Sequence, residues 1–77
     1  MPNTDLSQRE TEVHRLIGHG LSNKQIAREL TKIDGAPVSD GTVKEYAKRI
    51  ANKLGVHGRV LVALAYHGII IPSQDAS

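Results

Sequence analysis

The sequence contains no cysteine, no tryptophan and no phenylalanine, and besides its histidines the only aromatic residues are two tyrosines. Without cysteine the chain can form neither a disulfide nor a zinc site with thiolate ligands. With only two tyrosines we do not expect a platform on which the bases of a single strand could stack, because such a platform needs exposed aromatic side chains. The core of these 77 residues must therefore be built from Leu, Ile, Val and Ala, which suits short, closely packed helices.

Long apolar segments are missing as well. No run approaches the ~20 apolar residues of a membrane span, and residues 1–5 lack the basic and apolar regions of a signal peptide. We therefore expect a cytoplasmic protein that has no membrane partner. Polar residues at both ends predict a flexible leader over residues 1–5, one domain over residues 6–71 and a flexible tail over residues 72–77.

The formal net charge is only +2, but the charges are unevenly distributed. Residues 44–59 hold five basic residues and one acid, whereas residues 5–12 hold three acids and one base. A local basic excess is typical of a surface that meets an anionic partner. A charge run by itself is more often a solvated helix face, so the pattern needs further support.

Capping residues predict where the first helix lies. Ser7, with Glu10 three residues later, fits a capping box, so a helix is expected from there to about residues 17–19. Gly18 and Gly20 are expected to end it, because glycine adopts the left-handed conformation of a helix C-terminus without strain.

Three further helices follow from similar signals. Ser22 is expected to cap a second helix that runs to about Thr31, and residues 34–37 contain the turn signals Asp-Gly and Pro. A third helix is expected from the Ser39 cap to Gly55, and a fourth from about residue 57 or 58 to Gly68. The prediction is an all-α domain of four helices, with helices two and three as a helix-turn-helix pair.

The predicted third helix has two chemically different faces. Val43, Ala47, Ile50 and Leu54 recur at the spacing of a helix that packs on a core. The opposite side carries short, basic and amide residues: Gly41, Lys44, Glu45, Lys48, Arg49 and Asn52. Side chains of these types reach phosphates and base edges, so this helix could enter a DNA major groove.

Three segments together resemble one known family. Residues 6–13 (LSQRETEV) resemble the opening of the LuxR-type, or GerE-type, helix-turn-helix domain, and residues 20–30 (GLSNKQIAREL) resemble its second helix. Residues 39–44 (SDGTVK), Ile50 and residues 53–56 (KLGV) are similar to its recognition helix. The resemblance extends over residues 6–70 and implies a four-helix DNA-binding domain of bacterial transcription regulators.

The resemblance also implies roles for individual residues. The third helix would enter the major groove of double-stranded DNA, where the positions of Lys44, Glu45 and Lys48 face bases. Predicted phosphate contacts, with Asn52 added from the same helix face, are Asn23, Lys24, Thr42, Arg49, Asn52 and Lys53.

The sequence differs from the family pattern in specific places. Residues 31–37 stand where the family has about one residue, which lengthens the turn and is compatible with an added helical turn on residues 31–33. Tyr46 replaces a frequent His. Glu45 is unusual at a base-facing position, and it could either accept from a cytosine N4 amine or pair with a neighbouring lysine or Arg49.

The fourth helix is apolar on more than one side. In the family this helix commonly mediates dimerisation, and monomers rarely expose large apolar areas, so we expect a homodimer. The predicted dimerisation residues are Leu61, Val62, Ala65, Tyr66 and Ile69. The alternative is that the apolar residues after position 68 only cover the small core.

Nothing in the sequence predicts catalysis. The four histidines show no metal-ligand spacing with a carboxylate or thiolate partner, and no catalytic triad or carboxylate pair stands out. We therefore expect no enzyme activity, no cofactor, no metal and no small-molecule ligand.

The resulting hypothesis is a stand-alone transcription regulator, since the amino-terminal receiver or ligand-binding domain usual in the family is missing here and the chain starts at Met1. The alternative is a small interaction module that binds and antagonises a larger LuxR-type regulator through its fourth helix. RNA polymerase is a further candidate partner.

Overall fold

The structure is a computed structural model, and it describes residues 5–68. Within this range the chain forms helices and no strand, which confirms the predicted all-α class. The helices are α1 (Gln8–Gly18), α2 (Asn23–Asp34), α3 (Asp40–Leu54) and α4 (Arg59–Tyr66). Most of the predicted leader, the dimerisation residue Ile69 and the predicted tail lie outside the described residues.

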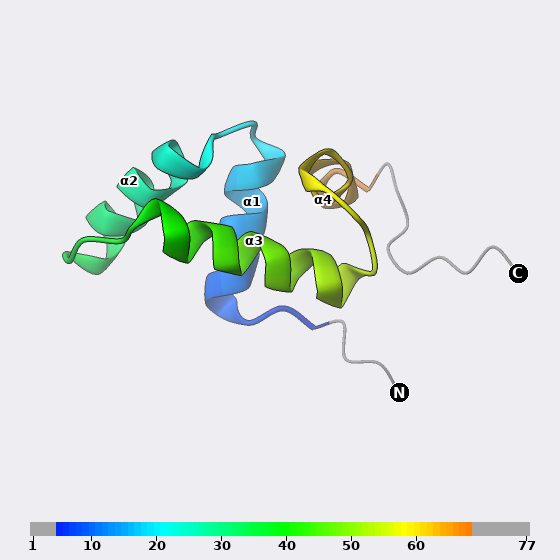
Figure 1. Cartoon of the computed structure of the whole chain (residues 1–77), viewed down its shortest axis with the longest axis horizontal. Coiled ribbons are helices and arrows are strands. Elements are labelled where there is room, and N and C mark those ends of the chain that lie inside the picture. Colours follow the sequence, from blue (N-terminus) through cyan, green and yellow to red (C-terminus); the bar gives the residue numbers. More distant parts are fainter. Residues whose placement is uncertain (1–4, 69–77) are drawn as a thin grey trace, which may run out of the picture.

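Helix α1 packs against each of the other three helices, and α3 packs against α2 and α4 as well. Figure 1 shows α3 lying across α1, with its first turns beside α2 and its last turns leading to α4. One side of the long helix α3 therefore packs against the domain, and its other side is exposed to solvent. None of the helices within residues 5–68 has the length and apolar character needed to cross a bilayer.

Serine side chains begin the first three helices, as the sequence predicted. The Ser7 hydroxyl accepts from the Glu10 backbone N–H at 3.1 Å, and the Glu10 carboxylate accepts from the Ser7 N–H at 2.9 Å. Ser22 and Gln25 form the same reciprocal pair at the start of α2. The Ser39 hydroxyl accepts from the backbone three residues later. Each cap satisfies an N–H that the helix itself leaves free.

The end of α1 differs from the prediction at Gly18. Gly18 is the last residue of the helix, and of these two glycines only Gly20 has a positive φ, of 86°. Gly18 is instead needed for close packing, because a Cβ added there would lie 2.3 Å from Cδ2 of Tyr66. The ring of Tyr66 occupies the space that any other side chain would fill.

Helix α2 runs three residues beyond its predicted end at Thr31. It continues to Asp34, and Gly35 closes it in the left-handed conformation with a φ of 73°. The lengthened connection thus contains an added helical turn, as residues 31–33 suggested. Ile33 on this added turn is 53% exposed.

The added turn is tied to the rest of the domain by polar contacts. The Thr31 hydroxyl donates to the Ala27 carbonyl at 2.8 Å and accepts from the Val38 N–H at 2.9 Å. The Arg9 guanidinium of α1 pairs with the Asp34 carboxylate, and this carboxylate is the main cause that raises the pKa of Arg9. The extra residues are therefore an ordered extension of α2.

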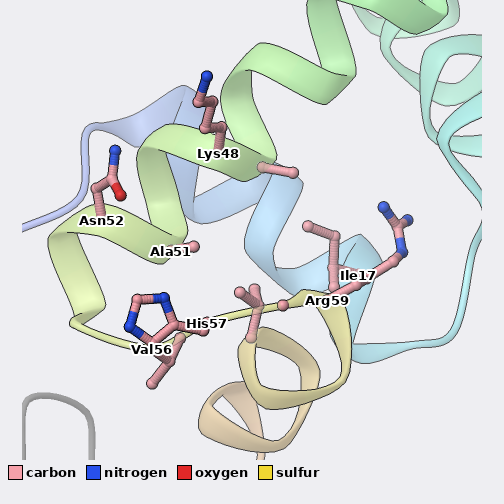
Figure 2. Close-up of a pocket in the computed structure, with 10 residues that line it drawn as sticks. Ile17, Lys48, Ala51, Asn52, Val56, His57 and Arg59 are labelled. Carbon is pink, nitrogen blue, oxygen red and sulfur yellow. The ribbon is translucent and has the colours of Figure 1, made fainter.

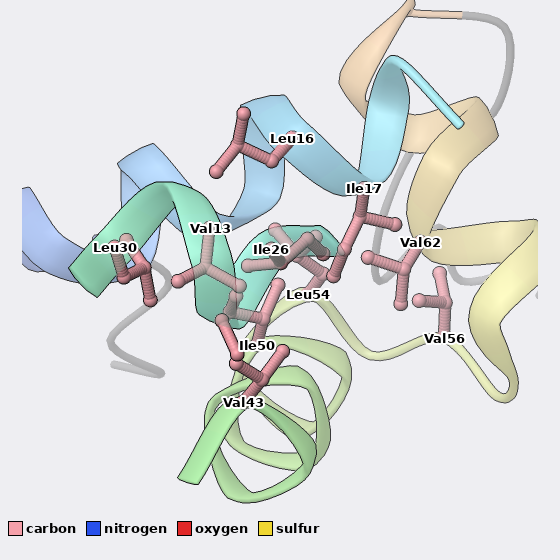
Figure 3. Packing of buried hydrophobic residues seen from close by; sticks show 11 residues of the cluster. Val13, Leu16, Ile17, Ile26, Leu30, Val43, Ile50, Leu54, Val56 and Val62 are labelled. Atoms are coloured by element: carbon pink, nitrogen blue, oxygen red, sulfur yellow. The ribbon is translucent and has the colours of Figure 1, made fainter. Parts of the chain in front are cut away.

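All four helices and the α3–α4 connection contribute aliphatic side chains to one core, which Figure 3 shows from close by. Of the predicted core-facing residues of α3, Val43, Ile50 and Leu54 belong to it, and Ala47 packs against it half-buried. The buried residues are Val13, Leu16, Ile17, Ile26, Ala27, Leu30, Val43, Ile50, Leu54, Val56 and Val62.

Helix α4 divides its apolar residues in a way that corrects one prediction. Val62, predicted as a dimerisation residue, is only 2% exposed and belongs to the core. Its side chain is closed to a partner in the folded domain. Leu61 and Ala65 pack half-buried against the core, whereas Val60 is 72% exposed. A helix that is apolar on most sides gives no sequence signal for its buried face.

Candidate nucleic-acid interface

The outer face of α3 is the side turned away from the buried row of Val43, Ile50 and Leu54. All of its long side chains are exposed. We define the outer face by Lys44, Glu45, Lys48, Arg49 and Asn52. The fold therefore presents the three predicted base-facing residues together on one accessible surface.

Lys44 and Lys48 carry free positive charge on this surface. They are exposed and four residues apart, so they lie on the same side of α3. Among residues 5–68 neither lysine takes part in an ion pair. Their ammonium groups are thus available to an anionic or acceptor-rich partner.

Lys53, predicted as a phosphate contact, is already engaged within the domain. Its ammonium lies 2.7 Å from Oε1 of Glu10 and 3.5 Å from the Asp5 carbonyl oxygen. The Glu10 residue is 2% exposed, and the Lys53 side chain is 29% exposed. Lys53 therefore fastens the last turns of α3 to the start of α1, and a phosphate contact by it stays a prediction.

The buried Glu10 carboxylate is held in its charged form. The hydrogen bond from Lys53 lowers its pKa most, and the backbone N–H of Ser7 lowers it further, while burial opposes both effects. A guanidinium nitrogen of Arg49 also lies 3.9 Å from Oε2. Two basic residues of α3 thus face one carboxylate of α1.

Arg49 is exposed but is drawn to one side of α3. Its guanidinium carbon lies 5.7 Å from the centre of the Tyr46 ring, within the range of a cation–π contact. Together with the approach to Glu10, this contact holds the charge near the α1 side. The predicted phosphate contact of Arg49 would be made from that position.

Glu45 is the residue for which the sequence left two readings open. In the described part of the chain it forms no ion pair with a lysine or with Arg49. Its exposed carboxylate lies between two shallow hollows on the outer face, one with Thr42 and Tyr46 and the other with Lys48 and Asn52. The structure does not support the reading in which a neighbour neutralises it.

The start of α2 brings a second group of polar side chains to the surface. Arg59, the first residue of α4, donates to Oδ1 of Asn23 and, at 2.6 Å, to the Leu21 carbonyl. Partial burial lowers the pKa of Arg59. With Oδ1 of Asn23 occupied, the amide NH₂ group is left as a donor next to the exposed Lys24.

Arg59 was not among the predicted site residues. It lies 36 residues from Asn23 in the sequence, and only the packing of α4 brings the two together. Its place in the basic run of residues 44–59 was the one available signal.

Comparison with known proteins agrees with this arrangement of helices and side chains. The model of the family described as "Bacterial regulatory proteins, luxR family" matches residues 4–65. The chain belongs to the luxR family. This confirms the resemblance seen in the sequence, and a match over most of the chain makes it a LuxR-type domain.

Individual relatives of this LuxR-type domain are bacterial regulators. It is 40% identical to "Transcriptional regulatory protein LnrK" of Bacillus subtilis over 60 aligned residues. The aligned region is 78% of this chain and 24% of the relative. It is also 40% identical over 65 residues to "Nitrate/nitrite response regulator protein homolog" of Haemophilus influenzae, covering 84% and 28%. The chain thus spans about a quarter of the length of these curated relatives. No solved structure matches it significantly.

A hollow of about 240 Å³ lies between α3 and α4 of the LuxR-type domain. Its floor is apolar and includes Ile17, Val56 and Val62. Figure 2 shows Lys48 and Asn52 at its edge, with their polar ends directed away from it. These two side chains therefore belong to the outer face of α3 rather than to an enclosed ligand site.

Three of the four histidines gather around the ring of Tyr66. The rings of His14, His19 and His67 each meet the Tyr66 ring edge-on, with centres 5.3 to 5.8 Å apart. His14 also donates to the Val62 carbonyl at 2.9 Å. Within residues 5–68, no three His, Asp or Glu side chains are placed to hold a metal ion.

Proposed function

We propose that this LuxR-type domain binds double-stranded DNA sequence-specifically and regulates transcription, with α3 in the major groove. The observation that carries the proposal is the pair of exposed lysines, Lys44 and Lys48, on the side of α3 opposite its buried row. Neither forms an ion pair within residues 5–68. Lysine donates to the O6 and N7 acceptors of guanine in the major groove. Glu45 is the third residue that we propose to face the bases.

Phosphate contacts would position the helix in the groove. The start of α2 offers the free amide donor of Asn23 and the ammonium of Lys24. Thr42, Arg49 and Asn52 are exposed along α3 and would contact the same backbone from the other side. Such contacts fix orientation and register without reading sequence.

We further propose that the domain acts as a homodimer through α4. Val60 exposes an apolar side chain at 72%, and Leu61, Ala65 and Tyr66 are half-buried on the same short helix. A two-fold dimer would read two half-sites about 34 Å apart, one turn of DNA. Val60→Asp should lower the apparent mass in sedimentation and weaken binding to a two-half-site duplex.

The DNA proposal is tested by matched charge removals. Lys48→Ala should weaken binding to a selected duplex by about 1–3 kcal/mol, because a base contact is lost. The control is Arg15→Ala, which removes an exposed charge on the side of α1 turned away from the core and should leave binding within about twofold. Fluorescence anisotropy at several salt concentrations supplies the affinities, since phosphate contacts make binding fall with salt.

Equal losses of DNA affinity in the Lys48→Ala and Arg15→Ala variants would indicate that the domain attracts DNA only nonspecifically. Equal affinity of the unaltered domain for selected and scrambled duplexes would contradict sequence-specific recognition. A non-enzymatic role accords with the regulatory family to which the chain belongs.

A second candidate function rests on the same exposed Val60. An apolar residue open to solvent on α4 would also suit binding to the corresponding helix of a larger LuxR-type regulator, which the domain would antagonise. In that case the purified domain would fail to shift DNA and would release a purified LuxR-type regulator from its own operator. The Val60→Asp variant should lose this effect.

A further inference from the structure

Glu45 stands out because it is the only acid on the outer face of α3. It lies next to Lys44 and one turn before Lys48 and Arg49, so basic groups surround it. A glutamate at this place would ordinarily form an ion pair with the residue four positions later. Here that residue is Arg49.

The structure shows why this pair is absent. The Arg49 guanidinium lies over the Tyr46 ring and reaches to 3.9 Å from the buried Glu10 carboxylate. The Lys48 ammonium does not come within 4.0 Å of Glu45 either, among the ion pairs of residues 5–68. Glu45 therefore brings an uncompensated carboxylate to the surface that is proposed to face DNA.

A carboxylate without a partner is costly at such an interface. Docking α3 in a groove would strip water from Glu45 and bring it near phosphates, so the complex needs a hydrogen-bond donor for it. The amine donors in the major groove are N4 of cytosine and N6 of adenine. The adenine amine lies beside the N7 acceptor, whose lone pair repels a carboxylate, whereas no acceptor of cytosine adjoins N4 in the groove.

From these observations we infer that Glu45 is a specificity-determining residue that selects a cytosine in each half-site, through a hydrogen bond from the N4 amine. The inference rests on the proposed function and names what one side chain of that surface reads. A guanine in a neighbouring base pair presents O6 and N7 acceptors to Lys48, one helical turn further along α3. Glu45 then accepts a hydrogen bond from a base amine, and Lys48 donates to base acceptors.

Selection of duplexes from a random pool tests the inference. The unaltered domain should enrich one cytosine position in each half-site, and thymine at that position should weaken binding by about 5- to 150-fold, the usual cost of one mismatched pair. Thymine is the sharp comparison because its O4 acceptor replaces the N4 donor. With Glu45→Ala the ratio between the two duplexes should fall to about one, while the other selected positions remain.

Glu45→Gln supplies a second, independent readout. The Gln amide can accept from cytosine N4 or, turned over, donate to thymine O4, so this variant should bind both duplexes with similar affinity. Because Glu45 is exposed and forms no ion pair among the described residues, both variants should unfold at the same temperature as the unaltered domain. Altered binding would then not reflect lost folding.

The possible outcomes distinguish a failure of this inference from a failure of the proposed DNA binding. An unchanged consensus and an unchanged cytosine-to-thymine ratio in Glu45→Ala would overturn the inference and leave DNA binding intact. A selected site with no cytosine dependence at any position would overturn it as well. Failure of the unaltered domain to select any duplex would overturn the proposed function and the inference together.

Discussion

The ammonium of Lys53 lies 2.7 Å from a carboxylate oxygen of Glu10, and this pair joins the last turn of α3 to the first turn of α1. The carboxylate is nearly buried and also accepts from the Ser7 backbone, so it serves a helix cap and a helix contact at once. The orientation of the proposed recognition helix thus depends on one glutamate in another helix.

Removing the charge of Glu10 should therefore destabilise the domain. We expect Glu10→Gln to lower the free energy of unfolding by about 1–3 kcal/mol, because a charge-assisted hydrogen bond is lost and Lys53 keeps an unpaired ammonium. Glu12→Gln is the control, since its carboxylate only pairs with Arg9 at the surface, at 3.2 Å, and should cost less than about 1 kcal/mol. Urea unfolding measures both, and equal losses would contradict the structural role of Glu10.

The same carboxylate predicts how stability depends on pH. The folded-state pKa of Glu10 lies below its ordinary value of 4.5, so the folded domain releases this proton more readily than the unfolded chain. The stabilisation is fully present above about pH 4.5 and is lost as the pH falls through the folded-state pKa. Melting temperatures between pH 3 and 7 should fall less steeply on acidification in Glu10→Gln than in the unaltered domain. Parallel curves for the two proteins would exclude Glu10 as a source of the pH dependence.

Two glycines in helices should respond in opposite ways to alanine. Gly18→Ala places a methyl group 2.3 Å from the Tyr66 ring, and we expect a loss of about 1–3 kcal/mol from this overpacking. Gly41→Ala is the matched control, because its Cβ would meet only the Ser39 hydroxyl, at 3.7 Å. There the better helix propensity of alanine should stabilise by up to about 1 kcal/mol. Thermal unfolding that showed the same sign for both would be inconsistent with the packing of Tyr66.

The added turn of α2 makes its own prediction at Thr31. Its hydroxyl is the acceptor for the Val38 N–H, so Thr31→Val should leave that partly buried donor unpaired and cost about 1–2 kcal/mol. Thr31→Ser keeps the hydroxyl and should retain most of the stability. Hydrogen exchange at the Val38 amide adds a local measurement, with faster exchange expected in the valine variant only. Slow exchange in both variants would mean that another group protects this amide.

Local chemistry made much of the fold predictable. The hydroxyls of Ser7, Ser22 and Ser39 lie where the sequence placed helix starts, because an N-cap is decided by a residue and its next three neighbours. The buried row of α3 was equally predictable from helical periodicity. The outer face of α3 followed directly, since it is the remainder of the same helix.

Longer-range relationships were not predictable in the same way. The end of α2 was placed three residues early, because the contacts that hold its added turn come from Val38 and from Arg9 of another helix. The role of Arg59 beside Asn23 likewise depends on two segments that meet only after folding.

The sequence by itself determined the helix class, the caps, the two faces of α3 and the family, because these depend on spacings of a few residues. Only the tertiary structure decided that Val62 is buried while Val60 is exposed, since a short helix that is apolar on most sides fits a core in several ways. Only the tertiary structure also decided which charges remain free. Lys53 and Arg49 face Glu10 across two helices, whereas Lys44, Glu45 and Lys48 form no ion pair within the part of the chain that the structure describes.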